Sequence, residues 1–265
     1  MNYQMSLFNI DLEKKEAESS KIKIIAWNIQ NSSKDRANKQ FRWIHDMNPD
    51  IIVLTEVTFS AGFALIKAEL EMQDYDVIYQ KSDSYFTVIA IRNYQYYQEI
   101  LDIIRLSERV NYIKLETPIG NIALIGVYAP TCSRDHEKIL QKRKFHHELY
   151  NEVIDKIWRI SSDTKIIVLG DFNILEPNHN PKYEGFSNYF KSYEQFTRKP
   201  FKDLYRYYES ETMEYSWFGQ GMYQRLDHIF ATENILPYVN KVEYLHEPRR
   251  NKFSDHSALQ IELNI

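Results

Sequence analysis

Six short segments of the sequence carry polar side chains of the types that bind metal ions. They lie at the ends of apolar runs and read WN (27–28), TE (55–56), VYAP (127–130), GDFN (170–173), RLDH (225–228) and SDH (254–256). If these ends meet at one rim, the rim holds carboxylates, amides, a phenol and imidazoles. Carboxylate and amide oxygens are hard ligands that suit Mg²⁺ or Mn²⁺. Together the segments predict a divalent-metal site.

Each of these residues also has an ordinary structural explanation. Asn28 and Asn173 can cap a helix or a turn, and Glu56 can open a helix, where the dipole favours a carboxylate. The same holds for the phenol, the remaining acids and the last imidazole, which are Tyr128, Asp227, Asp255 and His256. Taken singly, all of them except those in GDFN (170–173) and SDH (254–256) favour the structural explanation, but taken together and in this order they favour a functional site. A zinc site is not expected, because the chain has one cysteine and its histidines lack zinc-ligand spacing.

Apolar, β-branched runs predict the strands that would position these residues. The expected strands span 21–27, 51–54, 75–79, 85–91, 110–116, 121–127, 165–170, 226–231, 239–245 and 257–263. Helical spacing predicts a helix capped by Asp35 that ends at Asn48-Pro49, and further helices at 63–72 and 135–160. Residues 176–224 are polar, aromatic and irregular, and predict no regular element.

Hairpin-paired strands alternate here with strands flanked by helices. This order predicts an α/β fold in which two sheets pack together with helices outside. A chain of 265 residues fits one domain of this kind. We expect a single catalytic domain at 21–265, preceded by a flexible N-terminal tail at 1–20.

The composition of the chain bears on its binding partners and its cellular compartment. A net charge of -4 and a pI near 6.1 do not indicate a nucleic-acid binder, although the acids of a metal site can mask a local basic surface. The single cysteine, Cys132, excludes a disulfide framework and favours a reducing compartment. No apolar run approaches a membrane span, and no signal peptide is recognisable at the start. We expect a cytoplasmic monomer without a membrane partner.

The order of the polar segments resembles the endonuclease/exonuclease/phosphatase superfamily, which includes exonuclease III, abasic-site endonucleases and deoxyribonuclease I. The resemblance covers residues 21–265 and depends most on GDFN (170–173) and SDH (254–256). It implies a four-layered α/β/β/α sandwich of two mixed sheets. It also implies a hydrolase that uses Mg²⁺ or Mn²⁺ to direct water at a phosphodiester.

The resemblance gives the metal and water roles to five residues. Glu56 would bind the metal with help from Asn28 and Asp255. Asp171 would orient or deprotonate the attacking water, and Asn173 would position the water and the phosphate.

The phosphate roles fall on three further residues. His256 would contact the phosphate oxygen on which charge builds, and Asp227 would hold the imidazole in its orientation. A carboxylate beside an imidazole also favours the imidazolium form. Tyr128 matches the position that contacts the phosphate.

Two segments favour DNA as the substrate. SRDHEK (133–138) resembles a stretch of exonuclease III, and YSWF (215–218) resembles the aromatic segment with which that branch contacts a displaced or abasic nucleotide. The residues expected to bind DNA are Arg134, Lys142, Arg143, Lys144, Trp217, Phe218 and Arg225. The alternatives are a solvated helix face at 142–144 and ordinary core aromatics at 217–218.

The sequence also departs from the abasic-site branch. That branch usually has Gln before the metal-binding Glu and Lys soon after it, whereas this chain has Thr55 and Thr58. The loop IQNSSKDR (29–36) lacks the usual Gly-Leu-Arg pattern. These departures favour general DNA cleavage over a specialised abasic-site role. Two alternatives remain, namely a phosphatase or phosphodiesterase acting on a small or lipid phosphoester, and a non-catalytic DNA-binding module.

QMSLF (4–8) resembles the pentapeptide with which bacterial proteins bind the replication sliding clamp. Gln4, Met5, Ser6, Leu7 and Phe8 match it position by position, with Met in the aliphatic position. Leu7 and Phe8 would fill an apolar pocket on the clamp, and residues 9–20 would serve as a polar tether. The alternative is that both side chains pack against the domain itself.

Overall fold

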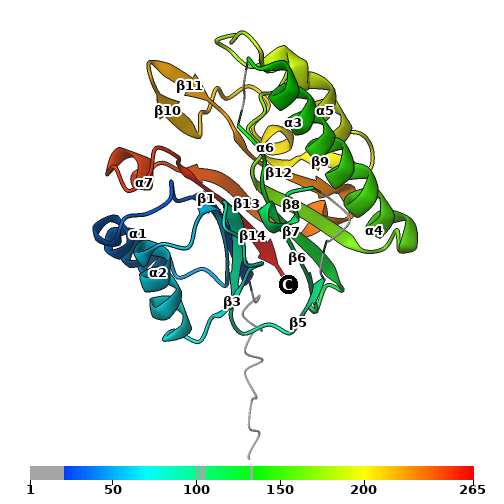
Figure 1. Cartoon of the computed structure of the whole chain (residues 1–265). Helices are drawn as coiled ribbons and strands as arrows, with labels where there is room; N and C mark the ends of the chain where they lie inside the picture. Colours follow the sequence, from blue (N-terminus) through cyan, green and yellow to red (C-terminus); the bar gives the residue numbers. More distant parts are fainter. Residues whose placement is uncertain (1–20, 100, 102–104, 132–133) are drawn as a thin grey trace, which may run out of the picture.

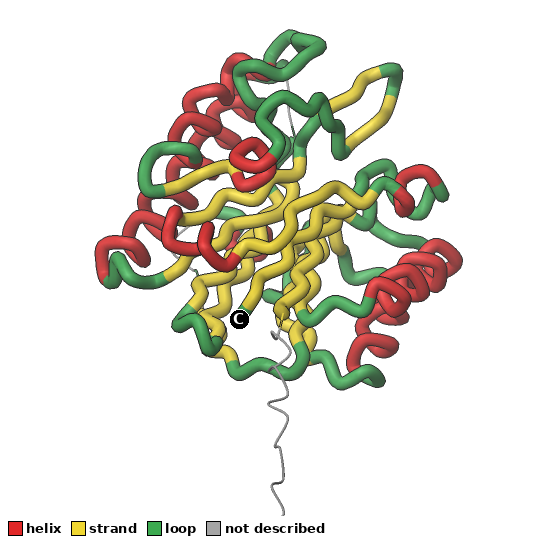
Figure 2. Tube along the Cα trace, turned by 180° about the vertical axis from the view of Figure 1, so that it is seen from behind, coloured by secondary structure: helices red, strands yellow, loops and turns green. Residues whose placement is uncertain are grey.

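The apolar runs form two six-stranded mixed sheets that pack face to face (Figures 1 and 2). This computed structural model describes residues 21–99, 101, 105–131 and 134–265. The first sheet has the order β13 (Val239–Leu245), β14 (Ala258–Asn264), β1 (Lys21–Asn28), β2 (Ile51–Val57), β4 (Phe86–Ile91) and β3 (Asp76–Ile78). The second has the order β5 (Tyr96–Glu99), β6 (Val110–Leu115), β7 (Ile122–Tyr128), β8 (Lys165–Asp171), β12 (Asp227–Thr232) and β9 (Phe201–Asp203).

One parallel pair lies at the centre of each sheet. β1 runs parallel to β2, and β7 runs parallel to β8, while the other ladders are antiparallel. The predicted hairpin between β6 and β7 is confirmed. Because parallel strands end at the same edge, the polar residues that follow β1, β2, β7 and β8 are brought to the edges where the site forms.

Both faces of each sheet are buried, which explains why the central strands are apolar without alternation. In β1, Ile24 packs between the sheets in the same cluster as Leu124 and Ile167 of the second sheet. The next residue in β1, Ile25, faces the opposite way into the cluster under the outer helices. The central strands are apolar along their whole length because one face packs against the other sheet and the other face packs under helices.

Helices cover the two outer faces and complete the expected α/β/β/α sandwich (Figure 1). The first sheet is covered by α1 (Lys34–Met47) and α2 (Ala61–Glu71). The second is covered by α3 (His136–Glu148), a π-helical segment (Leu149–Ile154), α4 (Asp155–Ile160) and α5 (Phe190–Phe196). Within the described ranges, no helix is long and apolar enough to cross a membrane.

Two local expectations are corrected. Helix α1 is capped by Ser33, whose hydroxyl accepts from the Arg36 N–H, so Asp35 lies in the first turn rather than at the cap. The segment 176–224 is not wholly irregular. It contains α5, β9, α6 (Leu204–Tyr208) and a hairpin of β10 (Trp217–Gly219) and β11 (Met222–Gln224). These elements are short, and their aromatic residues obscure any regular period.

Candidate active site

Strand pairing brings the predicted residues of both sheets to one edge of the sandwich. Tyr128 of β7 is paired with Asp171 of β8, and Asp227 of β12 lies opposite Asp171 on its other side. In the first sheet, Asn28 at the end of β1 is paired with the residue before Glu56. The phenol, the two amides and the acids therefore converge from strands that are distant in sequence.

The buried side chain of Asn28 joins the two sheets at this edge. Its Nδ2 donates to Glu56 Oε2 at 3.0 Å and to Asp171 Oδ2 at 2.9 Å. Its Oδ1 accepts from the Gln30 N–H at 2.9 Å. With all three contacts made, Asn28 sets the separation of the two carboxylates.

Glu56 has a backbone conformation that orients its carboxylate towards the centre. Its φ is 55°, in the left-handed region that few non-glycine residues adopt, and the β2–β4 register shifts between Leu54 and Val57. Burial raises the pKa of Glu56, and the hydrogen bond from Asn28 offsets only part of that effect. A cation beside this carboxylate would stabilise its ionised form.

The segment GDFN turns sharply at the end of β8. Gly170 has φ 133°, and a Cβ there would lie 2.2 Å from the carbonyl oxygen of Val127, so only glycine fits. The Asn173 N–H donates to Asp171 Oδ1 at 2.9 Å, and Asn173 Nδ2 donates to the Ala129 carbonyl at 3.0 Å. The turn fixes the acid and the amide relative to each other.

Asp171 is buried among groups that oppose its ionisation. Burial and the charge of Asp227 raise its pKa to about 7, although His256 and the Asn28 hydrogen bond act in the other direction. A carboxyl group with a pKa near neutral is suited to accepting a proton from water.

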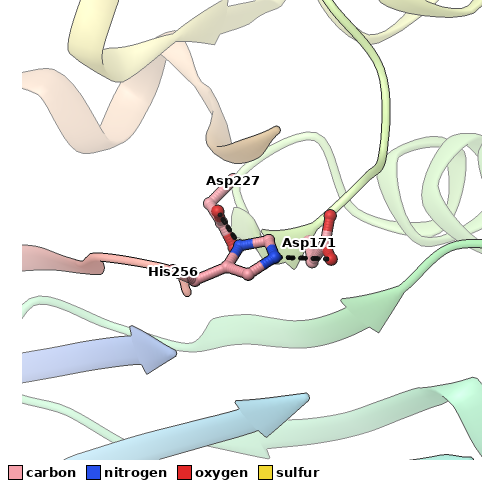
Figure 3. A group of neighbouring side chains, drawn as sticks. All are labelled: Asp171, Asp227 and His256. Carbon is pink, nitrogen blue, oxygen red and sulfur yellow. Dashed lines mark hydrogen bonds and ion pairs between the residues drawn. The ribbon is translucent and has the colours of Figure 1, made fainter. Parts of the chain in front are cut away.

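His256 lies between two carboxylates (Figure 3). Its Nδ1 is 2.8 Å from Asp227 Oδ2, and its Nε2 is 3.9 Å from Asp171 Oδ2. Burial alone would lower the pKa of His256, but the charge and hydrogen bond of Asp227, with Asp171 and Asp255, raise it to about 10. The ring is therefore an imidazolium at neutral pH, with Nε2 as its free donor.

The segment that carries His256 is anchored to the end of β1. Ser254 Oγ donates to the Asn28 carbonyl at 2.6 Å and accepts from the His256 N–H at 3.0 Å. Trp27 Nε1 donates to the His256 carbonyl at 3.2 Å. Neither Ser254 nor Trp27 is among the site residues expected from the sequence. Their only sequence signal is their position beside SDH and WN.

A cavity of about 530 Å³ opens over these residues. Its floor contains Glu56, Tyr128, Asp171, Asn173, Asp255 and His256. One wall comes from the segment 183–186, the β10–β11 hairpin and Leu226. It carries Tyr183, Phe186, Trp217 and Met222 beside the polar Glu184, Gln220 and Gln224. The cavity therefore combines a charged floor with a largely apolar wall.

Comparison with models of known protein families shows which family has this fold and these motifs. The model described as the endonuclease/exonuclease/phosphatase family matches residues 25–256. The chain belongs to that family. Its members hydrolyse phosphoester bonds, and the edge where the acids, amides and imidazole converge is the candidate site for that chemistry.

Several solved structures share the fold. The chain superposes on the 3′ phosphatase NExo from Neisseria, bound to product DNA hairpin, with a TM-score of 0.76 and 21% identity, covering 92% of this chain and 100% of that one. An AP endonuclease from Archaeoglobus fulgidus gives 0.73 and 19%, with coverage of 92% and 100%. Truncated TDP2 from Caenorhabditis elegans gives 0.68 and 18%, with coverage of 92% and 98%. A search of curated proteins finds no match.

The donor set fits the divalent cation that the family implies. Asp255 contributes an enclosed Oδ1 that has no hydrogen-bond partner among the described residues, while its Oδ2 accepts from Trp217 Nε1 at 2.8 Å. Asp255 and Glu56 both line the cavity, and the charge of Asp255 raises the pKa of Glu56. Hard oxygen donors of this kind suit Mg²⁺ or Mn²⁺.

A second group of possible ligands overlaps this one. Asp171, Asp227 and His256 offer ligand atoms that lie within 4.8 Å of one another (Figure 3). In this group His256 is already hydrogen-bonded to Asp227, and its raised pKa keeps both ring nitrogens protonated. A protonated imidazole has no lone pair for a metal. The carboxylates of Glu56 and Asp255 are therefore better metal ligands than His256.

The residues expected to bind DNA have different surroundings. Trp217 and Arg134 line the cavity, and Arg134 lies 3.6 Å from Glu184 in an exposed ion pair. Arg143 and Lys144 are exposed on α3. Phe218 lies under the guanidinium of Arg249, with 3.5 Å from Cζ to the ring centroid.

For two of the expected residues a DNA contact is corrected. Lys142 is fully buried, and its ammonium donates to the Asn173 carbonyl and lies 4.0 Å from the Tyr189 ring centroid. Arg225 is also fully buried and pairs with Asp203 at 2.7 Å and Glu176 at 3.1 Å. Both cations bind buried groups of the protein itself, so neither is exposed to a DNA backbone.

Residues 4–8, proposed from the sequence to bind a sliding clamp, lie outside the described residues.

Proposed function

We propose that the chain is an Mg²⁺- or Mn²⁺-dependent DNA nuclease. The observation that carries the proposal is the cavity in which a charged floor meets an apolar wall. The floor supplies what phosphodiester hydrolysis requires, and the wall supplies a surface for the sugar or base of a nucleotide.

Asp171 is the residue that accepts a proton from the attacking water in this proposal. Its carboxylate is held from one side by Asn28 Nδ2 and from the other by the Asn173 N–H, so the group cannot rotate away. Asn173 then lies two residues further along the same turn, where its side chain is fixed by the Ala129 carbonyl. A fixed base removes part of the entropic cost of aligning the water.

His256 stabilises the negative charge that develops on the phosphoryl oxygen. The Asp227 carboxylate holds Nδ1, which leaves the protonated Nε2 as a preorganised donor. One such donor typically contributes about two to three powers of ten in rate. Glu56, with Asn28 and Asp255, would hold the metal, which when bound supplies Lewis acidity and orients the phosphate.

Several observations favour DNA over a small phosphoester. The aromatic wall includes Trp217, whose indole is fixed to Asp255 and so cannot swing out of the cavity. Arg134 stands at the same cavity with an exposed guanidinium that can turn towards a phosphate. A structural neighbour, NExo, was solved with a DNA hairpin.

We further propose that a bacterial sliding clamp recruits the enzyme through residues 4–8. The support is the match of QMSLF to the clamp-binding pentapeptide together with a net charge of -4. An acidic protein gains little from long-range attraction to DNA. A tethered clamp would instead raise the local DNA concentration.

Cleavage of defined DNA tests the proposed activity. The protein is incubated with Mg²⁺ and end-labelled single-stranded, duplex, nicked and abasic DNA, and the products are resolved at single-nucleotide resolution. We expect cleavage that EDTA abolishes and that Glu56→Gln and His256→Gln each reduce by at least about a hundredfold. Undiminished cleavage in excess EDTA contradicts the metal requirement. Release of phosphate from inositol phosphates, with no DNA cut, assigns the site to small phosphoesters instead.

A further inference from the structure

Helix α3 has an outer face that takes no part in the site described above. Its inner face is buried, where the Lys142 ammonium donates to the Asn173 carbonyl and His146 Nε2 lies 3.2 Å from the Phe172 carbonyl. On the outer face, a spacing of three and four residues places another set of side chains in one stripe along the helix. This exposed stripe consists of Leu140, Arg143, Lys144 and His147.

The exposed stripe of α3 forms one side of a groove of about 460 Å³. Helix α5 lies beside α3 on the outer face of the second sheet and forms the other side, with Lys191, Ser192 and Gln195 (Figure 1). Leu140 is 48% exposed here, and the aliphatic stems of the basic side chains extend its apolar surface. The groove is therefore large enough for a ligand, since ligand pockets span roughly 300–1,000 Å³.

The charges around the groove have one sign. Among the described residues that line it there are three cations, Arg143, Lys144 and Lys191, and no carboxylate. Lys144 lies 3.5 Å from Glu148, whereas Arg143 and Lys191 make no ion pair or hydrogen bond with any residue that the structure describes. This local surface is cationic although the whole chain has a net charge of -4. A ligand with negative charge would complement it.

The apolar surface of the groove indicates what kind of anion would bind. A nucleic-acid backbone would meet the cations but would leave Leu140 without an apolar partner. An acidic peptide with a bulky apolar side chain would match both the charge and the apolar surface, and burying that surface adds to the affinity. The groove shares none of its described lining residues with the catalytic cavity. A partner bound here would therefore leave the cavity open to substrate.

We propose that the groove between α3 and α5 is a docking site for an acidic segment of a partner protein. A bulky apolar side chain of that segment packs on Leu140, and its carboxylates pair with Arg143 and Lys191. Guanidinium–carboxylate pairs of this kind give geometric specificity as well as attraction. The docking site goes beyond the proposed nuclease function and does not depend on it.

Binding of synthetic peptides, measured by fluorescence anisotropy at low ionic strength, tests the docking site. The probe is a fluorescein-labelled peptide of four aspartates followed by leucine and phenylalanine, titrated with the full chain. We expect saturable binding to wild type. Two matched peptides, one with both apolar residues replaced by serine and one with the aspartates replaced by asparagine, should each bind at least about tenfold more weakly.

Variants of the groove locate the binding. Lys191→Glu and Leu140→Ser should each weaken binding of the probe peptide roughly tenfold. Both are surface changes, so their melting temperatures should stay within about a degree of wild type. Lys138→Glu, an exposed residue of α3 that does not line the groove, is the matched control and should bind as wild type does. Should Lys191→Glu fail to fold, Lys191→Gln is tested in the same way.

Four outcomes would overturn the docking site. The first is wild-type protein that binds none of the peptides. The second is equal weakening by Lys138→Glu and Lys191→Glu, which indicates general attraction between charges. The third is equal binding of the leucine–phenylalanine peptide and its serine counterpart, which shows that the apolar surface is not used. The fourth is a single-stranded oligonucleotide, in EDTA, whose affinity falls tenfold with Lys191→Glu while that of the probe peptide does not, which assigns the groove to nucleic acid.

Discussion

At the scale of single residues, the site places acids where burial opposes their charge. Asp171 and Asp227 face each other at paired positions of β8 and β12, and both are almost fully buried. Such an arrangement costs stability, because two carboxylates in one low-dielectric site repel each other. The imidazolium of His256 lies between them and offsets part of the cost. Function and stability are therefore opposed at these residues.

Asp171→Asn tests this opposition. The amide cannot take a proton from water, so we expect DNA cleavage with Mg²⁺ to fall by at least about a hundredfold. The same change removes a buried charge that burial and Asp227 disfavour, so the melting temperature in EDTA at pH 8 should stay constant or rise by a few degrees. Asp163→Asn, in an exposed loop, is the control for both measurements. A variant that loses activity and melts several degrees lower would assign Asp171 a structural role instead.

His146, a second buried histidine, makes stability depend on pH without contributing to the site. Its Nε2 lies 3.2 Å from the Phe172 carbonyl, and burial together with the charge of Lys142 lowers its pKa to about 3. In the unfolded chain the pKa is near 6.5. Between about pH 6.5 and 3 the unfolded state therefore binds more protons, and stability must fall as the pH falls.

The contribution of His146 is measurable by urea denaturation. At pH 5 it should lower the free energy of unfolding by about 2 kcal/mol relative to pH 7. His146→Gln keeps a donor for the Phe172 carbonyl and removes the titration, so its unfolding free energy should fall less between pH 7 and pH 5. The neighbouring exposed residue provides the control, His147→Gln. Equal slopes for wild type and His146→Gln would contradict the assignment.

At the scale of secondary-structure elements, buried ion pairs hold the irregular segment 176–224 against the second sheet. Arg225 precedes β12 and contacts Glu176 and Asp203, which caps α6. Arg206 of α6 pairs with the same Glu176 at 2.6 Å. Burial would raise the pKa of Asp203, but Arg225 and His228 hold it far below its usual range. The network fixes the start of β12 and with it Asp227.

Removing Arg225 should therefore unfold this region first. Arg225→Met leaves Asp203 buried without its arginine partner and Glu176 with Arg206 alone, and we expect a loss of about 3–5 kcal/mol in the free energy of unfolding at pH 7. Arg225→Met combined with Asp203→Asn should recover part of that loss, because it removes the stranded charge of Asp203. Arg198→Met, on the exposed surface, is the control. A loss below about 1 kcal/mol in a chemical denaturation curve would show that the network is not needed for stability.

The strands and the site core were predictable from the sequence, whereas the segment 176–224 was not. Strands such as β1 and β8 are buried on both faces, so their composition alone identified them. Their polar ends were identified because each apolar run stops at a polar residue and the order of these residues resembles a known family. Burial at Lys142 and Arg225 could not be seen, because a basic residue in the sequence is normally exposed and only tertiary contacts provide its partners.

At the scale of the whole molecule, the hairpin beside the cavity is attached by hydrogen bonds to the segment that carries His256. The β10–β11 hairpin and α7 (Glu247–Arg250) lie on the same side of the molecule (Figures 1 and 2). The hairpin is tied to the catalytic segment by the Phe218 N–H, which donates to the Asp255 carbonyl at 3.3 Å, and by the Ser257 N–H, which donates to the Ser216 carbonyl at 2.7 Å. Ser216 also accepts from the Asp227 N–H at 3.1 Å. In the proposed nuclease, a substrate contact on the hairpin would therefore be coupled to Asp227 and His256.

The negative net charge of the whole protein affects how it would be recruited to DNA. With a net charge of -4, the protein has no general attraction to DNA, and a clamp bound through residues 4–8 would supply it locally. We expect the full chain to bind a bacterial sliding clamp in a calorimetric titration, with the modest affinity of a short segment that is ordered on binding. Leu7→Ala/Phe8→Ala should abolish binding while the melting temperature stays within about a degree, because a contact made only with the clamp adds nothing to the free enzyme. Lys14→Ala/Lys15→Ala, in the same tail, should bind as wild type does. If wild type and the Leu7/Phe8 variant bind equally, or neither binds and that variant melts several degrees lower, these side chains belong to the fold of the enzyme rather than to a clamp interface.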